Sequence, residues 1–139
     1  MLVFIKTMLA HNKYLFFDLI NILVVAALYT TNNLIFKKMF WGTPVGAFCI
    51  GYFNDLICSF GFLSYLNICF SLFKYRITRF WEMQLWILAA GLTWEFVAPL
   101  LKPTSVTDPL DLLCYHLGTA GYYCINKLYI KNISMKKGK

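Results

Sequence analysis

Four long apolar runs, separated by short clusters of basic residues, constrain the fold of this sequence more than any other feature. Residues 14–36 contain no lysine or arginine, and further runs cover 45–73, 80–101 and about 109–129. A transmembrane helix needs about 20 consecutive, mostly apolar residues. The chain of 139 residues therefore has room for about four such helices and for no separate soluble domain. We predict an all-α integral membrane four-helix bundle, formed as a single domain by residues 1–139.

The composition favours a membrane protein over a nucleic-acid-binding protein. Hydrophobic residues make up 60% of the chain and charged residues only 14%, whereas about 25% of the residues of a soluble domain are charged. The net charge is +7, but the basic residues lie between and beyond the apolar runs, where they would contact membrane surfaces and anionic lipids. The five cysteines lie within apolar runs and form no C-x-x-C pair, so we expect neither a disulfide framework nor a zinc site.

The distribution of lysine and arginine predicts the orientation in the membrane. If all four runs cross, the start of the chain, the loop after the second run and the tail carry two, three and five basic residues. These ten residues share one side, and the two loops on the other side carry three. Because cytoplasmic segments are enriched in lysine and arginine, we predict that both termini are cytoplasmic and that the loop containing Ser105 faces outward.

Acidic residues near the predicted outer ends of three runs mark a candidate site. Asp55 follows Asn54 about ten residues into the second run, Glu95 lies near the end of the third, and Asp108 and Asp111 begin the fourth. An ionisable side chain inside a membrane segment is costly and commonly marks a functional site. We therefore predict an outward-facing acidic pocket between the second, third and fourth helices. Its candidate residues are Asn54, Asp55, Glu95, Asp108, Asp111, Tyr115 and His116.

Helix capping is the alternative role for the two aspartates of the fourth run. Asp108 followed by Pro109 is typical of a helix N-cap, and Asp111 stands where the second acidic residue of a capping box would stand. Such caps satisfy free backbone amides at the start of a helix. We expect capping to be the main role of Asp108, whereas Asp111 can both cap the helix and line the pocket.

Ordinary packing is the alternative for the other candidates. Glu95 could be a neutral carboxyl that is hydrogen-bonded to Tyr115 or Asn54 of a neighbouring helix, or a partner of Lys102 at the rim. A single histidine in a helix, such as His116, is more often a hydrogen-bonded packing residue than a metal ligand. On the opposite side of the membrane, we expect Asp18 to pair with a basic residue of the loop after the second run, which offers Lys74, Arg76 and Arg79.

Helical spacing predicts which faces pack together. Small residues let helices approach closely, so we expect the stripe of small and polar residues on the second run to face the bundle and Leu63 to lie on the opposite face. Gly118 and Gly121 should likewise mark close packing of the fourth helix. The second-run stripe is Ala47, Gly51, Asn54, Cys58, Gly61 and Tyr65, and the matching face of the fourth run is Asp111, Tyr115, Gly118, Tyr122 and Asn126.

The C-terminal third of the chain contains a Trp-Glu pair, a polar Pro/Ser/Thr loop, an Asp-x-x-Asp-Leu-Leu segment and two glycines. The residues of this pattern are Trp94, Glu95, Pro103, Ser105, Asp108, Asp111, Leu112, Gly118 and Gly121. The pattern resembles the VanZ-like family of small bacterial integral membrane proteins. The resemblance implies a multi-pass protein of the bacterial plasma membrane with four to five helices, in a family whose named member is linked to resistance to the glycopeptide teicoplanin.

Three functions fit these features. The favoured one is binding or shielding of an outer-leaflet lipid or a lipid-linked cell-wall precursor, with a resistance-like role. The second is a cation-dependent hydrolase or transferase of lipid phosphates, and the third is a small transporter or accessory subunit. No cofactor is expected except a divalent cation, for which Asp55, Glu95 and Asp111 are the weak candidate ligands. We expect membrane lipids as partners and no nucleic acid, with a second copy of the chain or another envelope protein as further candidates.

Overall fold

The computed structural model describes the backbone of residues 2–101 and 108–135, and the side chains of residues 13–97, 100–101 and 108–132. The loop 102–107, with Ser105 and Lys102, lies outside these ranges. Within them, all regular structure is helical, as predicted. The elements are α1 (Leu2–Thr31), the π-helical segment η1 (Asn32–Phe36), α2 (Lys37–Met39), α3 (Pro44–Gly51), α4 (Phe53–Ser71), α5 (Phe80–Leu101) and α6 (Pro109–Met135).

The helix boundaries agree with the predicted runs in part. The predicted run 80–101 is α5, and α6 begins at Pro109 as expected but continues past the predicted end near residue 129 to Met135. The helix continues as far as Met135 because no proline or glycine interrupts it there. Two stretches, Lys13–Met39 and Pro44–Ser71, are long and apolar enough to cross a membrane.

The second predicted run consists of two helices. Tyr52 leaves helical geometry, with φ −121° and ψ −22°, and separates α3 from α4. In the turn before α3, Gly42 has φ +77°, a backbone conformation that glycine adopts without a steric cost. Thr43 then caps α3 by accepting a hydrogen bond from the amide of Gly46 at 3.1 Å, and Pro44 occupies the first helical position.

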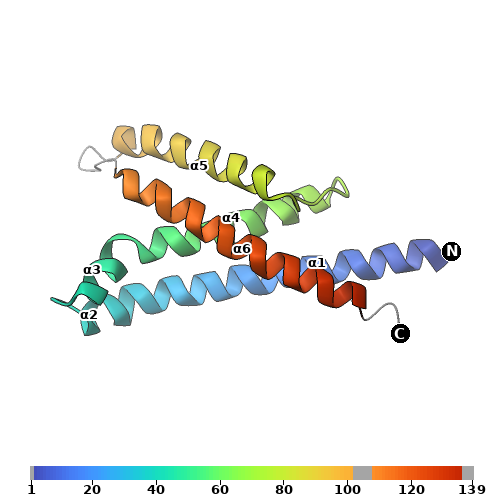
Figure 1. Cartoon of the computed structure of the whole chain (residues 1–139), viewed down its shortest axis with the longest axis horizontal. Helices are drawn as coiled ribbons and strands as arrows, with labels where there is room; N and C mark the ends of the chain where they lie inside the picture. Colours follow the sequence, from blue (N-terminus) through green and yellow to red (C-terminus); the bar gives the residue numbers. More distant parts are fainter. Residues whose placement is uncertain (1, 102–107, 136–139) are drawn as a thin grey trace.

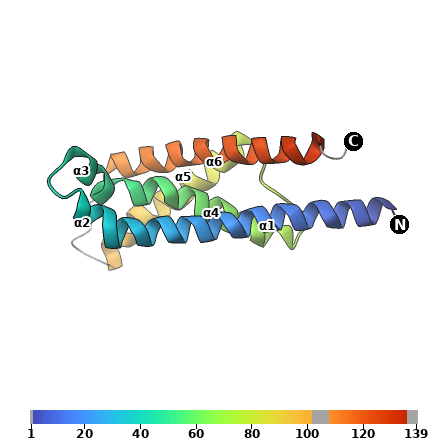
Figure 2. The same cartoon turned by 90° about the horizontal axis from the view of Figure 1, so that it is seen from below.

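The helices are arranged around α4. It packs against α1 on one side and α6 on the other, while α5 packs mainly against α6 and only approaches α4 (Figure 1). The start of α1 and the end of α6 lie at the same end of the molecule, and the turn between α2 and α3 lies at the opposite end (Figures 1 and 2). Because α5 leans on α6 rather than on α1, one face of α4 is left without a covering helix.

Close contact between α4 and α6 follows from the predicted glycine pair. A Cβ atom at Gly118 would lie 2.1 Å from the carbonyl oxygen of Leu56, and one at Gly121 would lie 3.0 Å from the ring of Phe60. The predicted inner face of α6 is confirmed, since Gly118, Tyr122 and Asn126 are all buried and Tyr122 is 0% exposed.

The prediction for the second-run stripe was wrong. Ala47, Gly51, Cys58 and Tyr65 are exposed, whereas Leu63, which we expected on the opposite face, is 0% exposed. Polar residues take part in the buried face instead, because each finds a hydrogen-bond partner there. The buried residues of α4 are Ile57, Ser59, Leu63, Ser64 and Asn67.

A buried polar network joins α1 to α6 near the termini, as the sequence led us to expect for Asp18. The carboxylate of Asp18 forms an ion pair with Arg76 and accepts a hydrogen bond from the hydroxyl of Tyr122 at 3.0 Å. Arg76 also donates to Asn126 at 2.9 Å. Asn67 completes the network from α4 by donating to the Tyr122 hydroxyl at 2.9 Å.

Candidate functional site

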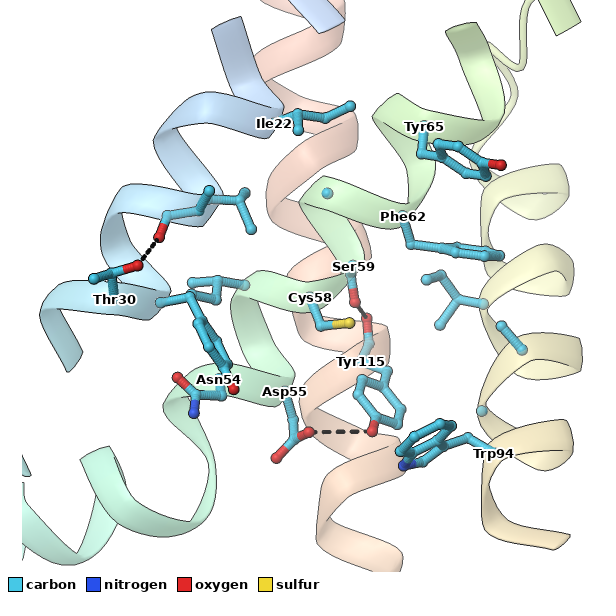
Figure 3. Close-up of a pocket in the computed structure, with 18 of the residues that line it drawn as sticks. Ile22, Thr30, Asn54, Asp55, Cys58, Ser59, Phe62, Tyr65, Trp94 and Tyr115 are labelled. Carbon is cyan, nitrogen blue, oxygen red and sulfur yellow. Dashed lines mark hydrogen bonds between the residues drawn. The ribbon is translucent and has the colours of Figure 1, made fainter. Parts of the chain in front are cut away.

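A cavity of about 980 Å³ lies on the uncovered face of α4, between α1 and α5 (Figure 3). Tyr29, Tyr65 and Trp94 lie at its margin on three different helices and are 54%, 58% and 59% exposed, so the cavity is open to the surroundings. Most of its lining is apolar. The residues that α1 contributes are Ile22, Val25, Ala26, Tyr29 and Thr30, and those of α5 are Ile87, Ala90, Gly91 and Trp94.

The stripe of small residues on the second run lines this cavity. Gly51, Asn54, Cys58, Gly61 and Tyr65 are all among its lining residues. A Cβ atom at Gly51 would meet nothing within 4 Å, whereas one at Gly61 would lie 3.2 Å from the side chain of Val25 on α1. Most of the pattern that we interpreted as a helix contact is therefore a wall of an open groove, and Gly61 is in close contact with α1.

The cavity has an apolar end and a polar end. In Figure 3, Ile22 and Phe62 lie toward one end, whereas Asn54, Asp55 and the ring of Tyr115 lie toward the other. The lining extends along α4 from Asn54 to Tyr65, which corresponds to about 16 Å at 1.5 Å per residue. This length is close to half the thickness of the hydrocarbon core of a bilayer, which is about 30 Å.

Tyr115 is held in place at the polar end by two hydrogen bonds. Its hydroxyl donates to Oδ1 of Asp55 at 3.1 Å, and its carbonyl oxygen accepts a hydrogen bond from Oγ of Ser59 at 2.7 Å (Figure 3). The first bond orients the carboxylate of Asp55 in the cavity. Asp55 and Tyr115, both predicted site residues, are thus joined between α4 and α6, whereas the sequence analysis had named Glu95 as a partner for Tyr115.

A cluster of asparagines lies beside this end and ties α1 to the broken second helix. Nδ2 of Asn32 donates to the carbonyl oxygen of Cys49 at 2.8 Å and to Oδ1 of Asn54 at 2.9 Å. Asn54 in turn donates to Oδ1 of Asn33 at 3.4 Å. Our sequence reasoning did not select Asn32 and Asn33, although two consecutive asparagines in an apolar run were a signal that they have partners.

Of the four predicted carboxylates, Asp55 lines the cavity, and the other three lie outside the lining but near one another. Asp111 lies within electrostatic reach of Asp55, Glu95 and Asp108. The other two acidic residues of the chain are each paired with an arginine, Asp18 with Arg76 and Glu82 with Arg79. Among the residues that the structure describes, none of the four predicted carboxylates forms an ion pair. Lys37 is within electrostatic reach of Asp55, on the side of α2.

Asp108 caps α6, as predicted. Its Oδ1 accepts a hydrogen bond from the amide of Leu110 at 2.9 Å. Its Oδ2 is 3.5 Å from the hydroxyl of Tyr52, which donates to it from the break between α3 and α4. Asp108 therefore fixes the start of α6 and holds it beside the second helix.

The side chain of His116 contacts α5 instead of lining the cavity. Its Nδ1 donates to Oε1 of Gln84, and Nε2 of Gln84 donates to the carbonyl oxygen of His116 at 3.4 Å. This pair of bonds links α6 to α5 and corresponds to the packing role considered above. In the described part of the chain, no group of three or more His, Cys, Asp or Glu side chains is placed to hold a metal ion, so Asp55, Glu95 and Asp111 do not form a ready ligand set.

Sequence reasoning missed the wall that α1 contributes to the cavity. Ile22 and Ala26 line it, yet nothing in their residue types distinguishes them from outward-facing neighbours such as Leu23. In its described part the chain is a small helical protein with an open, mostly apolar groove that has the carboxylate of Asp55 at one end. Comparison of the chain with models of protein families, with curated proteins and with solved structures found no match.

Proposed function

We propose that all four helices cross a membrane and that the protein binds a membrane lipid in the cavity between α1, α4 and α5. The observation that carries this proposal is the cavity itself, which is apolar over most of its length and polar at one end. A lipid has the same division between chain and headgroup. The opening between α1 and α5 would face the hydrocarbon interior, so an acyl chain would enter sideways without crossing water.

The dimensions support a single lipid from one leaflet. The groove extends over about 16 Å of α4, close to the depth of one leaflet of the hydrocarbon core at about 15 Å. A volume of about 980 Å³ lies at the upper end of the usual range for ligand cavities. Outward-facing apolar residues surround the groove on α1, including Leu23 at 69% exposed, which suits a surface in contact with other lipids.

The predicted orientation of the helices determines which leaflet supplies this lipid. The polar end lies beside α2 and α3, and the turn between these helices is on the side with three basic residues rather than ten. By the positive-inside rule that side is outward, so the bound lipid belongs to the outer leaflet. The resemblance to VanZ-like proteins would set this binding in the bacterial plasma membrane, where it would shield an envelope lipid or a lipid-linked wall precursor.

Native mass spectrometry of the purified full-length protein tests this function. We expect one lipid to remain bound to the protein after extraction in mild detergent. Ala26→Trp should abolish its retention, because Ala26 lines the groove, whereas Ala27→Trp should not, because Ala27 is also exposed on the same helix but lies outside the lining.

Two results would contradict the proposal. One is a protein that carries no lipid under conditions in which it stays folded, and the other is an equal loss of lipid in the two tryptophan variants. Release of a cleaved lipid rather than an intact one would favour the hydrolase or transferase alternative.

A further inference from the structure

We infer that the bound lipid has a headgroup with a primary ammonium, which is held at the Asp55 end of the groove. This inference rests on the proposed function and specifies its ligand. It follows from three properties of the polar end: its charge, its unmet hydrogen-bonding capacity and the position of the nearest cation.

The charge of the polar end favours a positive partner. Asp55 lines this end, and Glu95, Asp108 and Asp111 lie within electrostatic reach of it or of one another, although the whole chain has a net charge of +7. The acidic residues at the opposite end, Asp18 and Glu82, each have an arginine beside them. A carboxylate in an apolar setting is stable only when it is paired or neutral, and the open groove beside Asp55 provides the space for a cationic group.

Hydrogen bonding selects an ammonium with N–H groups. Asp55 uses Oδ1 to accept the Tyr115 hydroxyl, and a carboxylate has about four acceptor positions in total. Asn32 lies behind this end rather than in the lining, and its buried Oδ1 has no donor among the described residues. At the groove itself, the carboxylate of Asp55 therefore has acceptor positions left for a donor on a ligand. A primary ammonium provides three donors, whereas a quaternary ammonium provides none.

The lysine nearest to Asp55 can contact the phosphate of the same lipid headgroup. Lys37, on α2, is half-buried and within electrostatic reach of Asp55. A phospholipid with a primary ammonium also has a phosphate one short linker away. With the ammonium at Asp55, the phosphate would lie toward Lys37, so both charges of a zwitterionic headgroup would have partners of opposite sign.

Competition between three lipids tests the inference. The full-length protein in non-ionic detergent is mixed with equal amounts of phosphatidylethanolamine, phosphatidylcholine and phosphatidylglycerol that have identical acyl chains, and bound lipid is measured by native mass spectrometry. We expect phosphatidylethanolamine to exceed each of the others by about tenfold, which corresponds to about 1.4 kcal/mol. Asp55→Asn should remove the preference but keep lipid bound, because the amide oxygen still accepts from Tyr115.

Glu82→Gln is the matched control, since it removes a carboxylate that lies on α5 away from the groove and is hydrogen-bonded by Tyr75. This variant should keep the preference. Glu95→Gln is a second variant near the site, which serves as the test if Asp55→Asn does not fold. It should weaken the preference for phosphatidylethanolamine.

The possible failures are distinguishable. Equal binding of the three lipids, preference for phosphatidylcholine through its contact with Trp94 and Tyr29, or a preference that survives in both site variants would overturn the headgroup assignment while leaving lipid binding intact. Failure to retain any of the three lipids would instead overturn the proposed function.

Discussion

At the scale of single residues, the space around each glycine determines its role. Gly118 lies against the backbone of α4, where an added Cβ atom would be 2.1 Å from the carbonyl oxygen of Leu56. Gly51 lies in the wall of the groove, where an added Cβ atom would meet nothing within 4 Å. Both glycines are in helices, so the same substitution compares a packed position with an open one.

Gly118→Ala should destabilise the protein by about 1–3 kcal/mol, the usual cost of overpacking a tight contact. Gly51→Ala should have little effect or stabilise slightly, because alanine favours the helix by about 0.5–1 kcal/mol relative to glycine. Thermal unfolding in detergent would measure both. Similar losses in the two variants would show that α4 and α6 are not in the close contact described above.

Residue types predicted some of these positions and not others. The inner face of α6 was predictable because polar residues such as Asn126 recur at helical spacing, and the pairing of Asp18 followed from its charge. The role of the second-run stripe was not predictable, because a small residue is compatible with either a tight contact or an open groove. Apolar residues such as Ile22 and Leu23 could not be separated, since burial in protein and exposure to lipid favour the same side chains.

At the scale of helices, the ion pair between Asp18 and Arg76 joins α1 to the loop between α4 and α5. Asp18 is 1% exposed, and the side chain of Arg76 is 16% exposed. Removing one partner of such a pair leaves the other charge without compensation in an apolar setting. The same loop is held from α4 by Asn67, whose Oδ1 accepts the amide of Ile77 at 2.8 Å.

Asp18→Asn should therefore lower the stability of the protein by about 3–5 kcal/mol. Glu82→Gln should cost at most about 1 kcal/mol, because Glu82 is paired at 3.8 Å with an arginine that is 82% exposed. The melting temperatures of the two variants in detergent would compare them. A smaller loss for Asp18→Asn than for Glu82→Gln would mean that the buried network does not hold these elements together.

Helix ends were predictable where capping residues mark them, as Asp108 and Pro109 do for α6. The break at Tyr52 was not, because its neighbour Gly51 also fits a continuous helix with a small residue on its surface. The π-helical segment η1 had no sequence signal that we recognised, although its buried Asn32 contacts the second helix directly beside that break.

At the scale of the whole molecule, the membrane orientation decides which leaflet supplies the ligand. Trp41 and Thr78 are exposed and lie in the turns at opposite ends of the bundle. In a background without the native cysteines, Trp41→Cys should react with an impermeant reagent in intact cells, and Thr78→Cys only after the membrane is opened. The reverse pattern would place the polar end of the groove at the cytoplasmic leaflet.

The groove itself is a property of the whole arrangement, since it exists only because α5 packs on α6 and leaves α4 uncovered beside α1. Whether a lipid occupies the groove is tested by photo-crosslinking with phosphatidylethanolamine that has a photoreactive group in its acyl chain. The lipid is bound at one equivalent to the purified full-length protein, and the cross-linked residues are mapped by mass spectrometry.

A lipid in the groove should form cross-links on its three walls, at Ile22, Phe62 and Ile87, and these should be lost in Ala26→Trp. Cross-links spread instead over the outward-facing Leu23 and Leu128, with no change in Ala26→Trp, would contradict the claim that a lipid occupies the groove.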